Sequence, residues 1–203
     1  MNQIDKIISE NPALLPCKAA MEQITAAIVC MHENGGKLLL CGNGGSAADC
    51  EHISGELLKG FLSKRPLPED SLTGLEDELR TKLQRGIGAV PLTSLSALGS
   101  AFANDVDPTL SYAQAVLALG QKNDVVLGIS TSGNAKNVAA ALKVARAMGL
   151  KTLAMTGEKG GLLKEIADVT LTVPETETYK VQQLHLPAYH AICAEVERIL
   201  FDH

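Results

Sequence analysis

Five short apolar segments, separated by stretches of helical periodicity, are the feature that most constrains the fold of this chain. The segments cover residues 37–41, 89–95, 124–130, 151–156 and 169–173. Helical patterns lie between or after them, over residues 47–59, 108–119, 134–148 and 180–200. Short strands that alternate with helices pair in parallel, and runs such as DVVLGI are apolar on both faces. The sequence therefore predicts an α/β fold, with helices on both sides of a parallel sheet.

Two helices are expected before the first strand, over residues 4–9 and roughly 13–32, with a break near Asn11 and Pro12. The second is apolar over a wide arc, which fits burial on the sheet and also allows contact with another subunit. Residues 66–85 are charged, and we expect a short surface helix there, capped by Ser71 or Thr73.

No repeat or change of composition divides the chain. We therefore expect a single domain over residues 1–203, with residues 1–35 as N-terminal helices and residues 66–85 as a helical insertion.

The composition argues against several functional classes. The net charge is −5 and only 3% of the residues are aromatic, whereas nucleic-acid-binding proteins concentrate positive charge and stack bases on aromatic rings. The N-terminus lacks a signal-peptide pattern, and we find no uninterrupted apolar run long enough to cross a bilayer. Five scattered cysteines without CxxC spacing fit a reducing compartment and small buried side chains. We expect a cytoplasmic protein without nucleic-acid or membrane partners.

The segment CGNGGS, residues 41–46, follows the first strand and leads into a helix. Glycines permit a tight turn there, and the free backbone N–H groups at the helix start attract an anion. Ser46 would add a hydroxyl donor and could cap the helix. The spacing matches neither the P-loop pattern GxxxxGK[ST] nor the dinucleotide pattern GxGxxG, so neither kind of nucleotide site is predicted.

A second junction of this kind, ISTSGN, follows the strand at residues 124–130. It places Ser130, Thr131 and Ser132 directly before a helix, with no lysine or arginine in the turn, which suits a phosphate monoester on a sugar. A helix cap with a tight turn explains either junction alone equally well. Two such junctions favour a ligand site, because doubly wound sheets bind ligands at the carboxyl ends of their strands.

His52 and Glu56 lie four residues apart on the helix after the glycine loop, so they share one face. They could converge on one metal ion or substrate atom, although an isolated pair of this kind is more often a solvated surface interaction.

The last helix carries further polar candidates, Gln182, His185 and His190. Pro187 lies among them and is expected to kink the helix. In a straight helix Gln182 and His190 would point roughly 80° apart. Periodicity alone therefore does not show whether these side chains meet His52 and Glu56.

The chain resembles the sugar isomerase (SIS) family, and within it the bacterial sedoheptulose 7-phosphate isomerases, in the order and spacing of its motifs. These are CGNGGS followed by H-x-x-x-E, then AND at 103–105, GISTSGN at 128–134, AMTGEKGG at 154–161 and Q-x7-H at 182–190. The resemblance implies a doubly wound, flavodoxin-like SIS domain with a five-stranded parallel sheet flanked by helices. It also implies a homotetramer whose sites are completed by neighbouring subunits.

The activity implied by the resemblance is a zinc-dependent aldose–ketose isomerisation. It would convert sedoheptulose 7-phosphate to D-glycero-D-manno-heptose 7-phosphate through an enediol, with Glu56 as general base and His190 as general acid or second base. The implied ligands of Zn²⁺ are His52, Glu56, Gln182 and His190. The implied substrate-binding positions are Asn43, Gly44, Gly45, Ser46, Glu56, Asn104, Asp105, Ser130, Thr131, Ser132 and Gln182.

Three departures from the family pattern bear on substrate identity more than on reaction type. Ala135 replaces a frequent serine, Tyr179 replaces an aspartate, and Gly60, beside Lys59, replaces an arginine. The alternative function is that of a non-catalytic SIS protein that binds a phosphosugar or associates with the replication initiator. The presence of both Glu56 and His190 favours the enzyme. His185 is expected to pack or support the site rather than bind the metal.

Overall fold

The computed structural model describes residues 2–68 and 71–202 and contains a five-stranded sheet in the order β2-β1-β3-β4-β5. All neighbouring strands are parallel. The strands are β1 (Leu38–Gly42), β2 (Ala89–Pro91), β3 (Val125–Ser130), β4 (Lys151–Thr156) and β5 (Val169–Thr172). This order is the flavodoxin-like one, so the predicted doubly wound α/β fold is confirmed.

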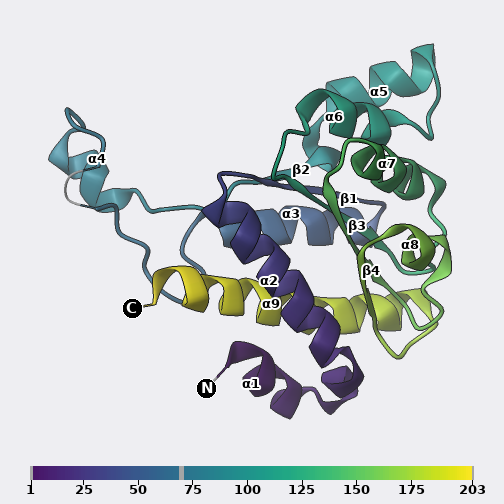
Figure 1. Ribbon diagram of the computed structural model, residues 1–203, viewed down its shortest axis with the longest axis horizontal. Helices are drawn as coiled ribbons and strands as arrows, with labels where there is room; N and C mark the ends of the chain where they lie inside the picture. Colours follow the sequence, from purple (N-terminus) through teal and green to yellow (C-terminus); the bar gives the residue numbers. More distant parts are fainter. Residues whose placement is uncertain (1, 69–70, 203) are drawn as a thin grey trace.

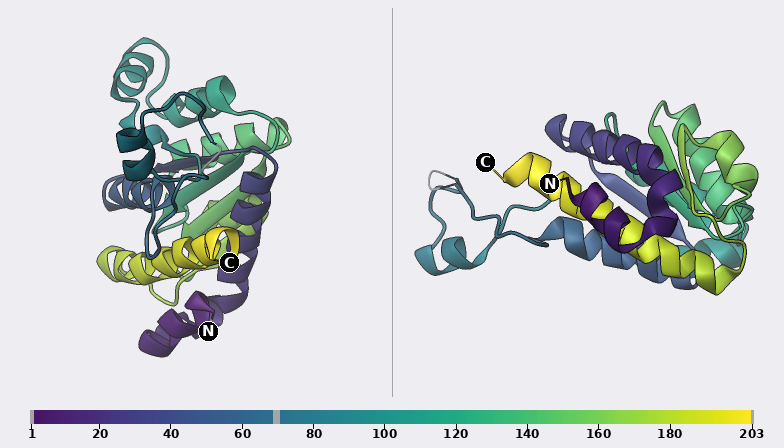
Figure 2. Two further views of the ribbon diagram at one scale, coloured as in Figure 1. Left: turned by 90° about the vertical axis from the view of Figure 1, so that its left-hand side faces the viewer. Right: turned by 90° about the horizontal axis from the view of Figure 1, so that it is seen from below.

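Alternate side chains of the strands point into two separate cores, one on each face of the sheet. Helices cover both faces (Figures 1 and 2). Leu38 and Leu40 of β1 pack into the first core, and Leu39 and Cys41 pack into the second. The first core is covered by α1 (Gln3–Glu10), α2 (Lys18–Glu33), α3 (Gly45–Leu58) and α9 (Thr178–Phe201). The second is covered by α6 (Ser111–Leu119), α7 (Lys136–Ala147) and α8 (Gly161–Ile166).

Two predicted elements are shorter than expected, in both cases because of proline. A 3₁₀ turn (Pro12–Cys17) occupies the start of the predicted helix over 13–32, and α2 begins only at Lys18. Pro12 and Pro16 lack the N–H groups that an α-helix needs. The predicted strand over 89–95 ends at Pro91, which lies on the edge strand, and a 3₁₀ turn follows.

The insertion extends away from the body of the molecule and carries the short helix α4 (Asp77–Lys82), as Figure 1 shows. The prediction of a cap at Ser71 or Thr73 is wrong, because α4 starts later and has no side-chain cap. Asp77 and Glu78 in its first turn instead favour the positive end of the helix dipole. Residues 69 and 70 of the predicted insertion lie outside the described residues.

A buried ion pair fixes the chain between α3 and the insertion. The Glu197 carboxylate of α9 accepts hydrogen bonds from the backbone N–H groups of Phe61, Leu62 and Ser63, at 2.6–3.0 Å, and from Arg65 Nε at 2.8 Å. The side chains of Arg65 and Glu197 are 0% and 1% exposed. This segment is consequently held against the second half of α9, close to the predicted site.

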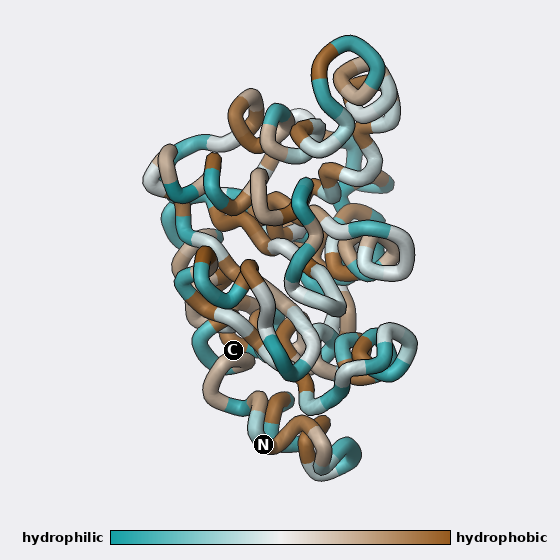
Figure 3. The backbone as a smooth tube through the Cα atoms, turned by 90° about the vertical axis from the view of Figure 1, so that its right-hand side faces the viewer, coloured by the Kyte–Doolittle hydropathy of each residue, from teal (hydrophilic) through white to brown (hydrophobic). Residues whose placement is uncertain are grey.

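One helical stretch, Pro12–Glu33, has the length and mean hydropathy (1.3) of a membrane-spanning helix. Lys18 and Glu22 lie within it, so it is not an uninterrupted apolar run. Met21, Ile24, Ile28 and Met31 of this stretch lie in the first core. Figure 3 shows such apolar segments, in brown, gathered inside the molecule. A core helix passes the same test, so the stretch is weak evidence for a membrane span.

Candidate active site

The side chains of His52 and Glu56 on α3 meet that of His190 on α9. His52 Nε2 lies 3.3 Å from Glu56 Oε1 and 3.5 Å from His190 Nε2. The two imidazole rings meet edge-to-face, with centroids 4.9 Å apart. Residues separated by about 138 positions in sequence are therefore brought together. The helix stays continuous through Pro187, so no break in α9 is needed for this contact.

The surroundings of the cluster differ from one member to the next. Glu56 is 15% exposed and receives a hydrogen bond from Lys59 Nζ at 3.1 Å. His52 is 44% exposed, and its Nδ1 lies 2.8 Å from the Tyr189 hydroxyl. The ring of Phe61 packs against that of His190, with centroids 5.5 Å apart. The cluster is thus open to solvent on one side and packed on the other.

Burial shifts the acid–base properties of two groups in this region. The pKa of His190 is lowered, first by burial and then by the neighbouring His52, while Glu56 acts in the opposite direction. Burial raises the pKa of Asp49, one turn before His52, to about 6, against a hydrogen bond from Tyr189 and the charge of His52. A histidine that favours its neutral form can accept a proton, as acid–base catalysis requires.

The side chain of Gln182, on α9, packs against the glycine loop at the start of α3. A Cβ atom added to Gly45 would be 2.2 Å from Gln182 Nε2, so the close approach of the amide requires glycine at position 45. Gly44, the N-cap of α3, has φ +56°, a conformation that also favours glycine. Ser46 is buried and makes no cap, which corrects the predicted capping role.

The glycine loop is tied to the other sheet face by two amide hydrogen bonds. Asn43 and Asn137 exchange Nδ2–H···Oδ1 bonds in both directions, each 2.9 Å long. The Tyr112 hydroxyl also donates to the Gly42 carbonyl at 2.6 Å. These contacts fix the position of one predicted substrate residue, Asn43, relative to the helix that follows Ser130–Ser132.

The loop after β3 opens into a cavity of about 280 Å³ at the carboxyl ends of the strands. Ser130 is buried, whereas Thr131 and Ser132 line the cavity together with Asn134, Gly157, Glu158, Lys159, Glu175 and Thr176. The Ser132 hydroxyl accepts a hydrogen bond from Asn134 N at 3.2 Å. The predicted hydroxyl-rich loop therefore borders a cavity at the edge of the sheet where a ligand site is expected. Lys159 adds a positive charge to this cavity that the sequence analysis did not predict.

Asn104 and Asp105 are two predicted site residues that lie away from the cluster. They lie at the end of α5 (Ser96–Asp105), exposed and hydrogen-bonded to each other at 2.8 Å. Figure 1 shows α5 at the far side of the molecule from α9. Among the described residues, no hydrogen bond or ion pair joins either of them to His52, Glu56 or His190.

Sequence reasoning missed two polar residues beside the cluster, Asp49 and Tyr189. Asp49 lies three positions before His52 and so shares its helix face, which is a signal that helical spacing offers. Tyr189 is adjacent to His190, but only the packing of α9 on α3 turns it towards His52. His185 is fully buried and its Nε2 lies 3.2 Å from the Thr156 carbonyl, which fits the predicted packing role.

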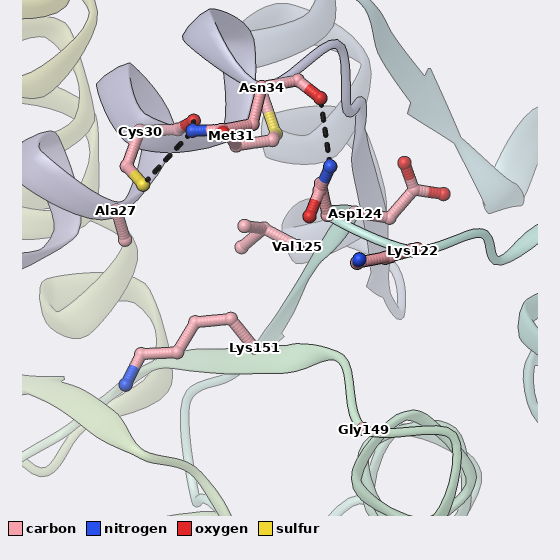
Figure 4. Close-up of a pocket in the computed structure, with 10 residues that line it drawn as sticks. Ala27, Cys30, Met31, Asn34, Lys122, Asp124, Val125, Gly149 and Lys151 are labelled. Atoms are coloured by element: carbon pink, nitrogen blue, oxygen red, sulfur yellow. Dashed lines mark hydrogen bonds between the residues drawn. The ribbon is translucent and has the colours of Figure 1, made fainter.

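A separate cavity of about 490 Å³ lies at the opposite edge of the sheet, where β3 and β4 begin (Figure 4). Lys122, Lys151 and Asn34 line it, together with Cys30, the one exposed cysteine of the five. None of the predicted site residues is among its lining residues. The carboxyl edge, and not this cavity, consequently carries the candidate active site.

Comparison with known proteins identifies the class. A family model described as SIS domain matches residues 15–157. The phosphoheptose isomerases of Neisseria gonorrhoeae and Francisella tularensis are structurally similar, each with a TM-score of 0.75 and 30% sequence identity. The first similarity covers 96% of this chain and 92% of that protein, and the second 98% and 100%. The fold is thus that of a SIS-domain protein.

Two sequence relatives define the family more narrowly. A phosphoheptose isomerase of Burkholderia pseudomallei is 37% identical over 183 residues, which are 90% of this chain and 83% of that protein. A phosphoheptose isomerase of Helicobacter pylori is 41% identical over 181 residues, which are 88% and 83%. The chain therefore belongs to the phosphoheptose isomerase family.

Proposed function

We propose that the protein is a phosphosugar aldose–ketose isomerase that converts sedoheptulose 7-phosphate to D-glycero-D-manno-heptose 7-phosphate. The observation that carries the proposal is the meeting of His52, Glu56 and His190 across α3 and α9. Moving a carbonyl group between C1 and C2 requires side chains that remove and return protons, and these three residues can do so. The names of the relatives support the substrate class.

Glu56 would act as the general base that removes the proton from C1 of the ketose and delivers one to C2. Its side chain is 15% exposed, less than those of its two ion-pair partners His52 (44%) and Lys59 (60%). Lys59 Nζ contacts one of the carboxylate oxygens at 3.1 Å. His190 would move a proton between the two substrate oxygens, since its lowered pKa favours the neutral form that can accept one.

The phosphate would lie beside the loop of Ser130, Thr131 and Ser132, where hydroxyl and backbone N–H groups can donate to its oxygens. Asn43, Gly44, Gly45 and Ser46 would hold the sugar at the start of α3. Fixing both ends would place C1 and C2 next to Glu56, and such orientation contributes strongly to rate.

The donor set also suits Zn²⁺. Two ligands of a tetrahedral zinc ion lie about 3.4 Å apart when each bond is about 2.0–2.1 Å, and the His52–Glu56 and His52–His190 distances are 3.3 and 3.5 Å. As the side chains lie, no three His, Cys, Asp or Glu residues among those described are arranged to hold a metal ion, so these side chains would have to move to bind one. Bound Zn²⁺, with Gln182 as fourth ligand, would polarise the substrate carbonyl.

We further propose that the protein is a cytoplasmic homotetramer. The position of Asn104 and Asp105 supports a site completed by another copy, because both are exposed and lie on α5, away from the cluster. The composition offers no support for nucleic-acid binding.

Turnover of sedoheptulose 7-phosphate by the purified protein, with and without added Zn²⁺, tests the proposal beside the Glu56→Gln variant. We expect conversion by the wild type and a loss of at least about 10³-fold in kcat for the variant, with its melting temperature unchanged. Absence of conversion by the folded wild type with Zn²⁺ would instead support the non-catalytic phosphosugar-binding alternative.

A further inference from the structure

The imidazole of His190 is oriented by packing more than by hydrogen bonds. Among the residues that the structure describes, its ring makes one hydrogen-bonding contact, at 3.5 Å to His52 Nε2, which is long for such a bond. The ring of Phe61 lies against the imidazole, with centroids 5.5 Å apart and planes inclined by 41°. Phe61 is half-buried and also packs against the first core. Its ring therefore limits the directions in which the His190 side chain can turn.

The backbone of Phe61 is held by Glu197, which follows His190 by two turns of α9. The Glu197 carboxylate, 1% exposed, accepts a hydrogen bond from the Phe61 N–H group at 2.7 Å. It also accepts from the N–H groups of Leu62 at 2.6 Å and Ser63 at 3.0 Å. The helix that carries His190 consequently also fixes the residue that packs against His190.

The same carboxylate connects this segment to α3, the helix that carries Glu56. Arg65 Nε donates to Glu197 Oε1 at 2.8 Å, and the guanidinium group also donates to the backbone carbonyls of Leu57 at 2.8 Å and Glu56 at 3.4 Å. These carbonyls belong to the last turn of α3, where C=O groups lack partners within the helix. One buried network thus joins the two helices of the proposed acid–base residues and places Phe61 between them and the insertion.

We propose that Phe61, held by Glu197, is a positioning residue that keeps the imidazole of His190 directed at the substrate beside Glu56. The inference rests on the proposed roles of Glu56 and His190 in the isomerisation. A misplacement of about 1 Å can lower a rate by about 10²-fold, so loss of the ring should act on kcat. It should leave KM nearly unchanged, because Phe61 is not among the residues proposed to bind the sugar or its phosphate.

The Phe61→Ala variant tests the inference, with Leu62→Ala as the matched control. Leu62 is the next residue and is held by the same carboxylate, but its side chain is 61% exposed. With sedoheptulose 7-phosphate we expect Phe61→Ala to lower kcat about 10–100-fold with KM within about twofold of the wild type, and Leu62→Ala to behave like the wild type. Phe61→Leu keeps an apolar side chain against the imidazole and should recover most of the lost kcat. A raised KM with unchanged kcat in Phe61→Ala would overturn the inference, because it would mean that Phe61 binds the substrate.

Crystal structures of the metal-free and substrate-free variants give a second result that does not depend on activity. We expect the His190 imidazole in Leu62→Ala to lie as it does in the wild type. In Phe61→Ala it should be displaced by about 1 Å or occupy more than one rotamer. A single His190 conformer at the wild-type position in Phe61→Ala would contradict the positioning role.

Glu197→Gln keeps the inference testable if Phe61→Ala fails to fold. Its amide has the shape of the carboxylate but accepts hydrogen bonds through one oxygen only, so the hold on residues 61–63 is weakened. We expect a displaced Phe61 ring together with a displaced His190 and a lowered kcat; a displaced Phe61 with unchanged kcat and an unmoved His190 would overturn the inference. If the structures show the expected displacements but the wild type with Zn²⁺ does not convert sedoheptulose 7-phosphate, the proposed function fails and the positioning of His190 by Phe61 stands.

Discussion

The middle and the C-terminal turns of α9 hold their polar residues in opposite ways. In the C-terminal turns the carboxylates of Glu195 and Glu197 are buried and surrounded by donors, which include Arg198 and Arg65. In the middle of the helix His190 is partly exposed, and its ring nitrogen faces another imidazole at 3.5 Å. Buried charges are paired as a rule, because an unpaired buried charge destabilises the fold, whereas incompletely paired groups in a cleft are typical of a site of reaction.

The largest effect is expected from His190→Gln in the middle of α9. Loss of this proposed acid–base residue should lower kcat by about 10²–10⁴-fold, while the free energy of unfolding should change by less than about 1 kcal/mol for a partly exposed side chain. Steady-state kinetics and urea unfolding measure the two quantities. Gln183→Ala, an exposed position on the same helix, is the control. A large loss of stability in His190→Gln would contradict the contrast between a reactive middle part and a structural C-terminal part of α9.

Glu197→Ala should show the reverse behaviour. Removing one partner leaves Arg65 as an unpaired buried charge and frees three backbone N–H groups, so we expect a loss of about 3–5 kcal/mol in the free energy of unfolding. Glu78→Ala, which removes an exposed ion pair on α4, should cost at most about 1 kcal/mol. Equal effects of the two substitutions, measured by urea unfolding, would show that burial of the pair is unimportant.

The pH dependence of stability tests whether His185, another residue of α9, is buried in its neutral form. Burial lowers the pKa of this histidine to about 4. Between pH 6.5 and about 4 the unfolded chain therefore binds a proton that the folded protein does not, so stability falls as the pH falls, by an amount on the order of 3 kcal/mol. His185→Gln should flatten this part of the pH profile. A variant with the same slope as the wild type would show that His185 is not buried in its neutral form.

The smallest effect is expected from the exposed amide pair of Asn43 and Asn137. We expect Asn43→Ala to raise KM about threefold to tenfold with little change in kcat, because one hydrogen-bonded pair contributes about 0.5–1.5 kcal/mol. Asn137→Ala should have a similar effect, and the double variant should be no worse than either single one. Additive effects on KM would mean that the two residues act separately.

The sequence predicts the sheet well because the strands are short and buried on both faces. β3 and β4 lie within one residue of the expected ends. It predicts helix starts and the edge strand less well, since proline and tertiary contacts decide them: β2 ends at Pro91, and α4 begins six or four residues after the expected caps. The helices α5 and α8 were not predicted, because segments of ten and six residues carry little helical periodicity.

The candidate site was predictable only in part. Helical spacing places His52 and Glu56 on one face, and the motif resemblance adds His190 and Gln182. The contact between Tyr189 and His52 spans 137 positions, and no local pattern predicts it. The separation of Asn104 and Asp105 from the cluster likewise depends on where α5 packs, which is a property of the whole fold.

Isomerisation in D₂O shows whether Glu56 transfers a proton between C1 and C2 of the substrate, as we propose. Nuclear magnetic resonance of the product locates any deuterium. We expect deuterium at C2 of the aldose formed by the wild type, because the proton held by a carboxylate exchanges with solvent, and no product from Glu56→Gln. Complete transfer of the C1 hydrogen to C2, without any deuterium from solvent, would indicate a hydride shift and contradict the account.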